Sequence, residues 1–188
     1  MPDYEKMGFE KPADWPVPTR EQTEVTYPIK PYFATEGNEA VREPILKLGK
    51  MITDRALQKL GVKKLTAEDP EYWSLAKIVT DEEAEVALSM GCRKPKFFEE
   101  IAELNKQHSK EHLQELLDHM SWTGLLEWNN ENLDGKNPEG KRRYVVPRYV
   151  PGSAEFTNMN LDLINENPEM GLFFHMMTKL HLEKVTHM

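Results

Sequence analysis

The sequence predicts a mainly α-helical fold with a small β-hairpin, in the order of a winged helix-turn-helix. Two short amphipathic segments, 97–104 and 109–123, predict the helix-turn-helix, because their apolar residues recur three and four positions apart. A polar loop at 129–140 lies between two short apolar runs and predicts the wing. The resulting order between Arg93 and Tyr149 is helix, turn, helix, strand, wing, strand.

Residues 1–43 are predicted to form an extended arm. They contain six prolines, each of which fixes its own φ and disfavours helix at the preceding residue. Aromatic residues lie between the prolines, which is unusual for a disordered tail. We therefore expect Trp15, Tyr27 and Phe33 to pack on the body of the protein or on a second chain.

Residues 44–150 are predicted to form the winged-helix domain, which begins with three helices. The first runs from Pro44 to a stop at Gly61, and the second begins at Asp69-Pro70. The third begins at Thr80, where Glu83 completes a capping box, and it ends at Gly91.

The helix-turn-helix and its wing follow these three helices. Ser109 is the expected N-cap of the second helix of the motif, and Gly124 is its expected end. Strands are predicted at 125–128 and 144–146, on either side of the wing loop.

Residues 151–188 are predicted to be a loop followed by C-terminal helices, at 160–165 and 169–180. The last of these is apolar on most of its circumference, which indicates burial on more than one side. Its residues Phe173, Phe174, Met176 and Met177 are therefore candidates for a protein interface, together with the aromatic residues of the arm.

Composition limits the possible functions. A single cysteine, Cys92, excludes a disulfide framework and any cysteine-based metal or cluster site within these 188 residues. No signal peptide and no apolar run long enough to cross a membrane are present, so we expect a cytoplasmic protein with no membrane partner. The sequence contains no phosphate-binding glycine loop and no nucleophile elbow, and it predicts no catalytic constellation.

DNA binding is the function that a winged helix most often indicates, but the charges oppose it. The net charge is -8, and the second helix of the motif exposes more acids than bases. Such a face repels phosphate, so nucleic acid is not the expected partner. The alternative of a DNA-binding regulator would use Lys110 together with the wing cations Lys141, Arg142 and Arg143.

Three histidines on or near the second helix are weak candidates for metal ligands. His108, His112 and His119 are spaced so that they could share one face. Zinc would need a further ligand, such as Glu111 or Glu115. Exposed histidines on a polar face explain the same spacing, so the expected metal content is none.

Three segments carry a resemblance to a known family. These are Glu68-Asp69-Pro70-Glu71-Tyr72-Trp73, the Arg93-Lys94-Pro95-Lys96 approach to the winged helix, and the run from Pro151 to Asn160. They resemble the N-terminal region of iron–sulfur flavoprotein oxidoreductases of anaerobic bacteria, in the pyridine nucleotide-disulfide class. The closing Leu182-Glu183-Lys184-Val185-Thr186 resembles the junction to the next domain of those enzymes.

The resemblance implies an accessory role beside a redox enzyme. In that family, [4Fe–4S] clusters and FAD belong to later segments, and this sequence reaches only Met188. No cofactor is therefore expected in this chain, which is either a fragment of such an enzyme or a free-standing relative. The predicted function is non-catalytic docking onto a redox module or onto a second copy of the chain.

Overall fold

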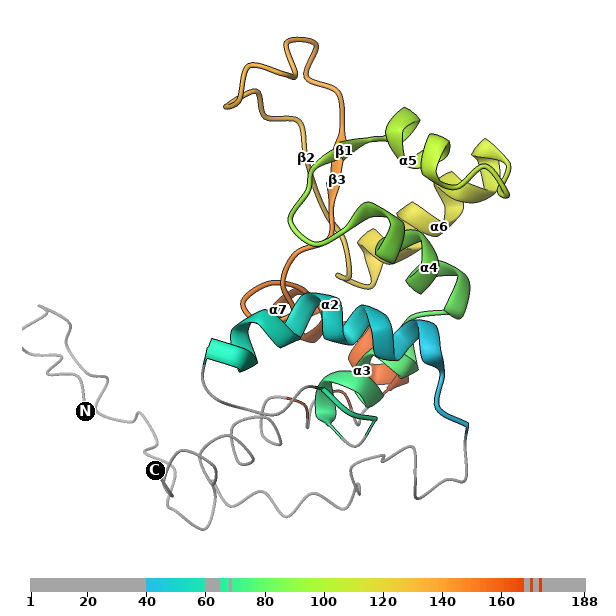
Figure 1. Cartoon of the computed structure of the whole chain (residues 1–188), viewed down its shortest axis with the longest axis vertical. Coiled ribbons are helices and arrows are strands. Elements are labelled where there is room, and N and C mark those ends of the chain that lie inside the picture. The colour runs from blue at the N-terminus through green and yellow to red at the C-terminus, as the bar shows by residue number, and fades with distance from the viewer. Residues whose placement is uncertain (1–39, 60–64, 68, 168–169, 171–172, 174–188) are drawn as a thin grey trace, which may run out of the picture. The chain divides into compact units, whose positions relative to one another are not determined.

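The computed structural model describes residues 40–59, 65–67, 69–167, 170 and 173. These residues form a mainly helical fold with a small three-stranded antiparallel sheet (Figure 1). Among the described helices, none is both long enough and apolar enough to cross a membrane. The predicted arm, 1–43, lies outside the described residues except for its last four positions.

Three helices precede the sheet: α2 (Glu43–Lys59), α3 (Pro70–Ile78) and α4 (Asp81–Met90). α2 packs against both α3 and α4, and it buries Ile45, Leu48 and Ile52. Arg42 joins the other two helices. Its guanidinium donates to the carbonyls of Ala76 and Val79 at the end of α3 and to the Asp81 carboxylate that begins α4. Unpaired carbonyls at a helix end attract such a cation.

The predicted capping box is present at the start of α4. The Glu83 amide donates to the Thr80 hydroxyl at 3.1 Å, and the Thr80 amide donates to the Glu83 carboxylate at 2.8 Å. Both bonds satisfy amide groups that a helix N-terminus otherwise leaves unpaired. The first turn of α4 carries three acidic residues, Asp81, Glu82 and Glu83, of which Glu83 belongs to this capping box.

The sheet contains β1 (Lys96–Phe97), β2 (Glu127–Asn129) and β3 (Arg143–Val145), in the order β1-β3-β2. Both neighbours of β3 run antiparallel to it, with Trp128 opposite Tyr144 and Lys96 also opposite Tyr144. The sequence predicted β2 and β3 with boundaries shifted by one or two residues, and it missed β1. β1 was missed because a strand of two residues shows no alternation of apolar and polar side chains, and because its partner strand β3 lies far along the chain.

Helices α5 (Phe98–Leu104) and α6 (Lys110–Trp122) lie between β1 and β2, as the periodicity predicted. Ser109 is the N-cap of α6 and accepts a hydrogen bond from the His112 amide at 3.1 Å. Asn105 closes α5 and bonds both the Ile101 carbonyl and the Ser89 hydroxyl of α4, which ties the α5–α6 loop to α4. The element order from α4 to β3 is therefore helix, strand, helix, helix, strand, loop, strand.

Two short helices follow the sheet, α7 (Ser153–Met159) and α8 (Leu161–Glu166). The sequence predicted α8 but missed α7. Gly152 precedes α7 with φ of 149°, and its amide donates to the Glu155 carboxylate at 2.7 Å. This carboxylate contact supplies a helix start without a capping side chain, a signal that the residue types alone do not show.

The C-terminal part of the core centres on Tyr149. Its hydroxyl donates to Ser74 of α3 at 2.6 Å, and its ring meets the Phe173 ring edge to face at 5.0 Å between centroids. The Ser74 hydroxyl lies 3.5 Å from the Met170 sulfur. These contacts join α3, the segment after β3 and the described residues of the predicted last helix in one buried layer.

Candidate functional site

The first turn of α4 faces the histidine-bearing side of α6. Glu82 and Glu83 are adjacent in sequence; Glu82 contacts His108 and His112, and Glu83 contacts His119. Negative side chains are favoured in the first turn because the helix dipole is positive there. The packing of α4 against α6 and the loop before it therefore places the two carboxylates beside the three imidazoles, a line of contacts called the seam below.

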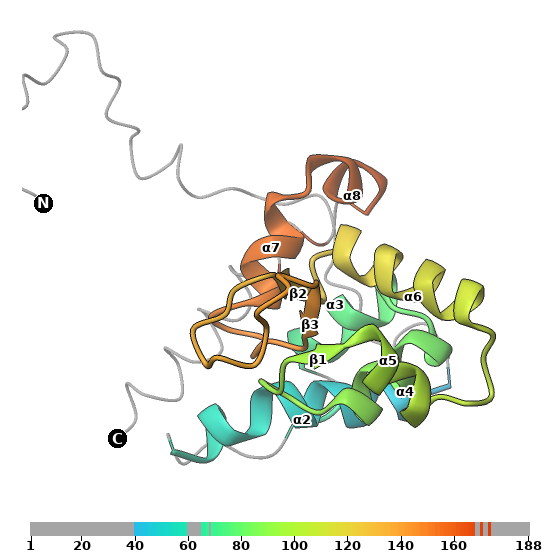
Figure 2. The same cartoon turned by 90° about the horizontal axis from the view of Figure 1, so that it is seen from above.

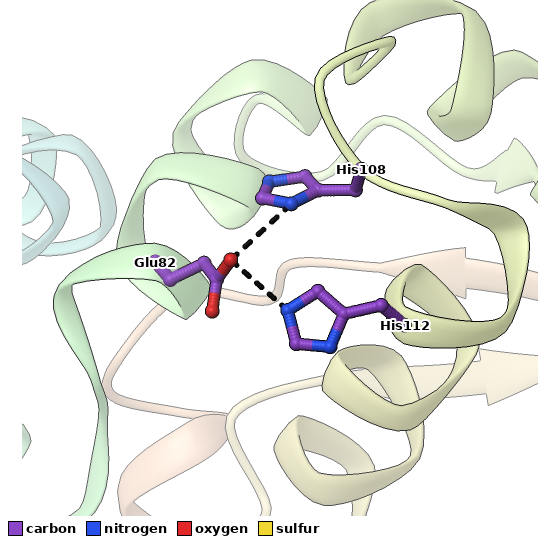
Figure 3. Close-up of side chains that lie close together, drawn as sticks. All are labelled: Glu82, His108 and His112. Carbon is purple, nitrogen blue, oxygen red and sulfur yellow. Dashed lines mark hydrogen bonds and ion pairs between the residues drawn. The ribbon is translucent and has the colours of Figure 1, made fainter.

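Glu82, His108 and His112 form a cluster at one end of this seam, with the Glu82 carboxylate between the two rings (Figure 3). One oxygen of Glu82 lies 3.2 Å from Nδ1 of His108 and 3.0 Å from Nε2 of His112. Their potential metal-ligating atoms all lie within 4.8 Å of one another. The residues come from three places: the first turn of α4, the α5–α6 loop and the first turn of α6.

The two rings are held differently. The His108 side chain is only 10% exposed, and within the described part of the chain its Nε2 has no hydrogen-bond partner. Among the described residues, the His108 ring is therefore held by a polar contact only through Nδ1, to the Glu82 carboxylate. The His112 side chain is half-exposed, and its other nitrogen, Nδ1, lies 3.6 Å from the Glu115 carboxylate.

The charge around His112 favours its protonated form. The hydrogen bond from its ring to the Glu82 carboxylate raises the pKa of His112 above the ordinary value, and Glu115 acts in the same direction. Opposite charge close to an imidazole stabilises the imidazolium ion. The contact between His112 and Glu82 therefore becomes an ion pair when the imidazole is protonated.

His119 belongs to a separate pair. Its Nδ1 contacts the buried carboxylate of Glu83, and its ring stacks on Trp122 with 5.8 Å between centroids. The structure thus brings His108 and His112 together but not His119. Sequence reasoning considered Glu111 and Glu115 as further ligands and missed Glu82, whose position inside a capping box made it look like an ordinary first-turn acid.

A second feature is an aromatic groove, which is defined by Trp122, Trp128, Phe156 and Met159. It has a volume of about 480 Å³ and lies between the end of α6, β2 and α7. Figure 2 shows the end of α6 beside α7. Trp128 is 50% exposed and Met159 is 76% exposed, so large apolar surfaces face solvent at both sides of the groove.

The backbone fixes the width of this groove. Gly124 follows α6 with φ of 83°, and a Cβ there would lie 2.7 Å from the Thr157 amide nitrogen of α7. Only glycine permits such close packing in this conformation. The Asn160 side chain also donates to the Trp122 carbonyl at 2.8 Å, so α6 and the α7–α8 junction are joined directly.

Three of the four cations proposed for DNA contact are engaged within the described structure. Lys141 lies 2.7 Å from Glu139, and the buried Arg143 is paired with Asp134 at 2.9 Å. The Arg142 guanidinium covers the Trp128 ring at 4.3 Å and lies 3.8 Å from Asp118. The fourth, Lys110, stands exposed in the first turn of α6.

The predicted interface residues have different placements. Phe173 is fully buried against Tyr149, so its side chain is not part of an exposed surface here. The other candidates lie outside the described residues, namely Trp15, Tyr27, Phe33, Phe174, Met176 and Met177. The exposed aromatic groove was not predicted, because its residues come from three elements that the sequence does not show to be neighbours.

Comparison with family models, curated proteins and solved structures gives no match. The function is therefore argued from the geometry of the two surfaces described above.

Proposed function

We propose that this chain is a non-catalytic winged-helix module that docks onto a protein partner through the aromatic groove. The winged-helix assignment rests on the element order from α4 to β3 and on the strand order β1-β3-β2. The partner is the iron–sulfur flavoprotein redox module that the sequence resemblance implies. The chain itself supplies a docking surface and no catalytic group.

The exposed aromatic groove is the observation that carries this proposal. Trp122, Trp128 and Phe156 are each close to half exposed and line one depression. Contiguous exposed aromatic surface of this kind marks interaction sites, since it is otherwise costly in water. Tryptophan and tyrosine are also the residues most enriched among those that dominate binding energy.

The geometry favours an extended segment of the partner as the occupant. β2 borders the groove and has only β3 as a neighbour among the described strands, so its other edge can pair with an added strand. Apolar side chains of such a segment would meet Trp122 and Phe156. Glu127 lines the groove and the chain carries a net charge of -8, so we expect a basic residue in the segment.

The test measures binding between the full chain and the holo iron–sulfur flavoprotein of the same organism. We expect a complex by isothermal titration calorimetry and by size-exclusion chromatography with light scattering. Phe156→Asp together with Met159→Asp should weaken it by about 10-fold or more, because charge would replace two of the apolar side chains that line the groove. Both side chains are exposed, so the substitutions should leave the fold intact.

The matched control is Leu133→Asp together with Leu104→Asp, which places two charges on exposed apolar residues outside the groove. This variant should bind like the unmodified chain. Absence of a complex, or equal weakening by both double variants, would contradict the proposal. If the chain alone forms a dimer that Phe156→Asp with Met159→Asp disrupts, the occupant of the groove is a second copy of the chain, and the proposed redox partner is wrong.

A further inference from the structure

We infer that Glu82, His108 and His112 bind a divalent transition-metal ion, with Zn²⁺ as the best fit. The inference is independent of the docking function, because the cluster and the aromatic groove have no lining residue in common. It replaces the spacing-based set of His108, His112 and His119 with a set that is assembled in three dimensions.

The ligand types select the class of metal. Two imidazole nitrogens and one carboxylate oxygen are a common zinc donor set, whereas Mg²⁺ and Ca²⁺ prefer oxygen ligands alone. Three protein ligands leave the fourth tetrahedral position open to water or to an exogenous ligand. The site would carry a carboxylate and two neutral imidazoles, so one negative charge faces the cation.

The distances are close to those that zinc requires. Metal–ligand bonds of 2.0–2.1 Å in a tetrahedron place neighbouring ligand atoms about 3.4 Å apart. Glu82 already lies 3.0 Å from His112 and 3.2 Å from His108. The two nitrogens lie within 4.8 Å of each other, so a side-chain adjustment of about an ångström completes the geometry.

The surroundings orient both rings for this role. Nδ1 of His108 lies 3.2 Å from the Glu82 carboxylate and so faces the cluster, while its Nε2 is buried without a hydrogen-bond partner among the described residues. Nε2 of His112 also points to the cluster, while its Nδ1 faces the Glu115 carboxylate. A carboxylate behind a ligating histidine is a recurring arrangement in metal sites, because it holds the ring and raises its basicity.

A bound ion would link α4 to α6 and to the loop between α5 and α6. Its ligands come from all three segments, so binding should stabilise the packing of α4 on the helix pair. Zinc should consequently raise the melting temperature of the chain, an effect independent of any activity.

The test uses the full chain without a histidine tag, stripped of metal by a chelator. Calorimetric titration with Zn²⁺ at pH 7.5 should show saturable binding, which the variants below assign to this site. Co²⁺ should give the visible absorption bands of a tetrahedral complex. Glu82→Gln and His112→Gln should each weaken binding by at least about 10-fold, since each removes a ligand. Both side chains are partly exposed, so circular dichroism should show an unchanged fold.

His119→Gln is the matched control. His119 lies on α6, as His112 does, but it contacts Glu83 and not Glu82. It should leave zinc affinity and the cobalt spectrum unchanged. No saturable binding up to millimolar zinc would overturn the inference. An equal loss of zinc affinity in His119→Gln would overturn it as well. So would unchanged zinc affinity in a double variant that combines Glu82→Gln with His112→Gln.

Discussion

At the scale of single residues, His112 links the charge of the cluster to pH. The hydrogen bond to Glu82 raises its pKa above the ordinary value of about 6.5. A raised pKa means that the folded state binds the proton more tightly than the unfolded state. The stabilisation is therefore fully present below the unfolded pKa and disappears as the pH rises through the folded pKa.

We expect an NMR titration of the His112 ring in the metal-free chain to show a midpoint above that of an unstructured histidine. Glu82→Gln should lower this midpoint, because it removes the main cause of the shift. The same substitution should reduce the urea midpoint of unfolding more at pH 5.5 than at pH 8.5.

Glu111→Gln is the control for this titration. It removes the same formal charge from the residue next to His112, yet Glu111 is not among the groups that shift the pKa of His112. Its His112 midpoint should stay close to that of the unmodified chain. Equal shifts in the two variants would show that overall charge, rather than the contact with Glu82, sets the pKa.

At the scale of elements, the two helix caps that the sequence predicted differ in what they hold. Ser109 accepts one amide bond at the start of α6. Thr80 accepts the Glu83 amide and also lies 3.1 Å from the buried Glu83 carboxylate, which in turn contacts His119. Removal of the Thr80 hydroxyl should therefore disturb a buried group as well as a helix end.

Thr80→Ala should accordingly lower the free energy of unfolding by roughly 1.5–2 kcal/mol, the upper part of the N-cap range. Ser109→Ala should cost about 0.5–1 kcal/mol, as a simple N-cap does. Urea unfolding followed by circular dichroism measures both, and the denaturant slopes should agree. A larger loss in Ser109→Ala would show that the Glu83 network contributes little.

These caps also show why some elements could be predicted and others not. Thr80 with Glu83, and Ser109, mark helix starts through bonds between residues three positions apart, so the residue types reveal them. β1 exists because Phe97 pairs with Arg143, a contact that no local pattern encodes. The site has the same limit: His108 and His112 are close in sequence and could be recognised there, whereas Glu82 reaches them only through the packing of α4 on α6.

At the scale of the whole molecule, charge separates docking from nucleic-acid binding. The net charge is -8, and α6 exposes acidic residues where a DNA-reading helix would need bases. The wing does not compensate, because Lys141 and Arg143 are paired with acids and Arg142 covers Trp128. Arg143 is buried in its ion pair with Asp134, whereas the pairs of Lys141 and Arg142 are exposed, so phosphate would have to compete with these acidic partners.

The final prediction is therefore that the chain does not bind duplex DNA in a salt-dependent manner. Fluorescence anisotropy with a labelled duplex should show no association at 50 mM salt, a condition that strengthens contacts to phosphate. Asp118→Asn with Glu139→Gln releases Arg142 and Lys141 from their acidic partners and removes two negative charges, so any latent affinity should appear in this variant first. Binding by the unmodified chain would contradict the docking proposal and favour a regulator if the plot of log affinity against log salt had a slope steeper than about -3, equivalent to roughly three phosphate contacts.

A second double variant, Lys141→Gln with Arg142→Gln, would then locate the contact. Loss of DNA binding in this variant would identify the β2–β3 loop as the contact surface.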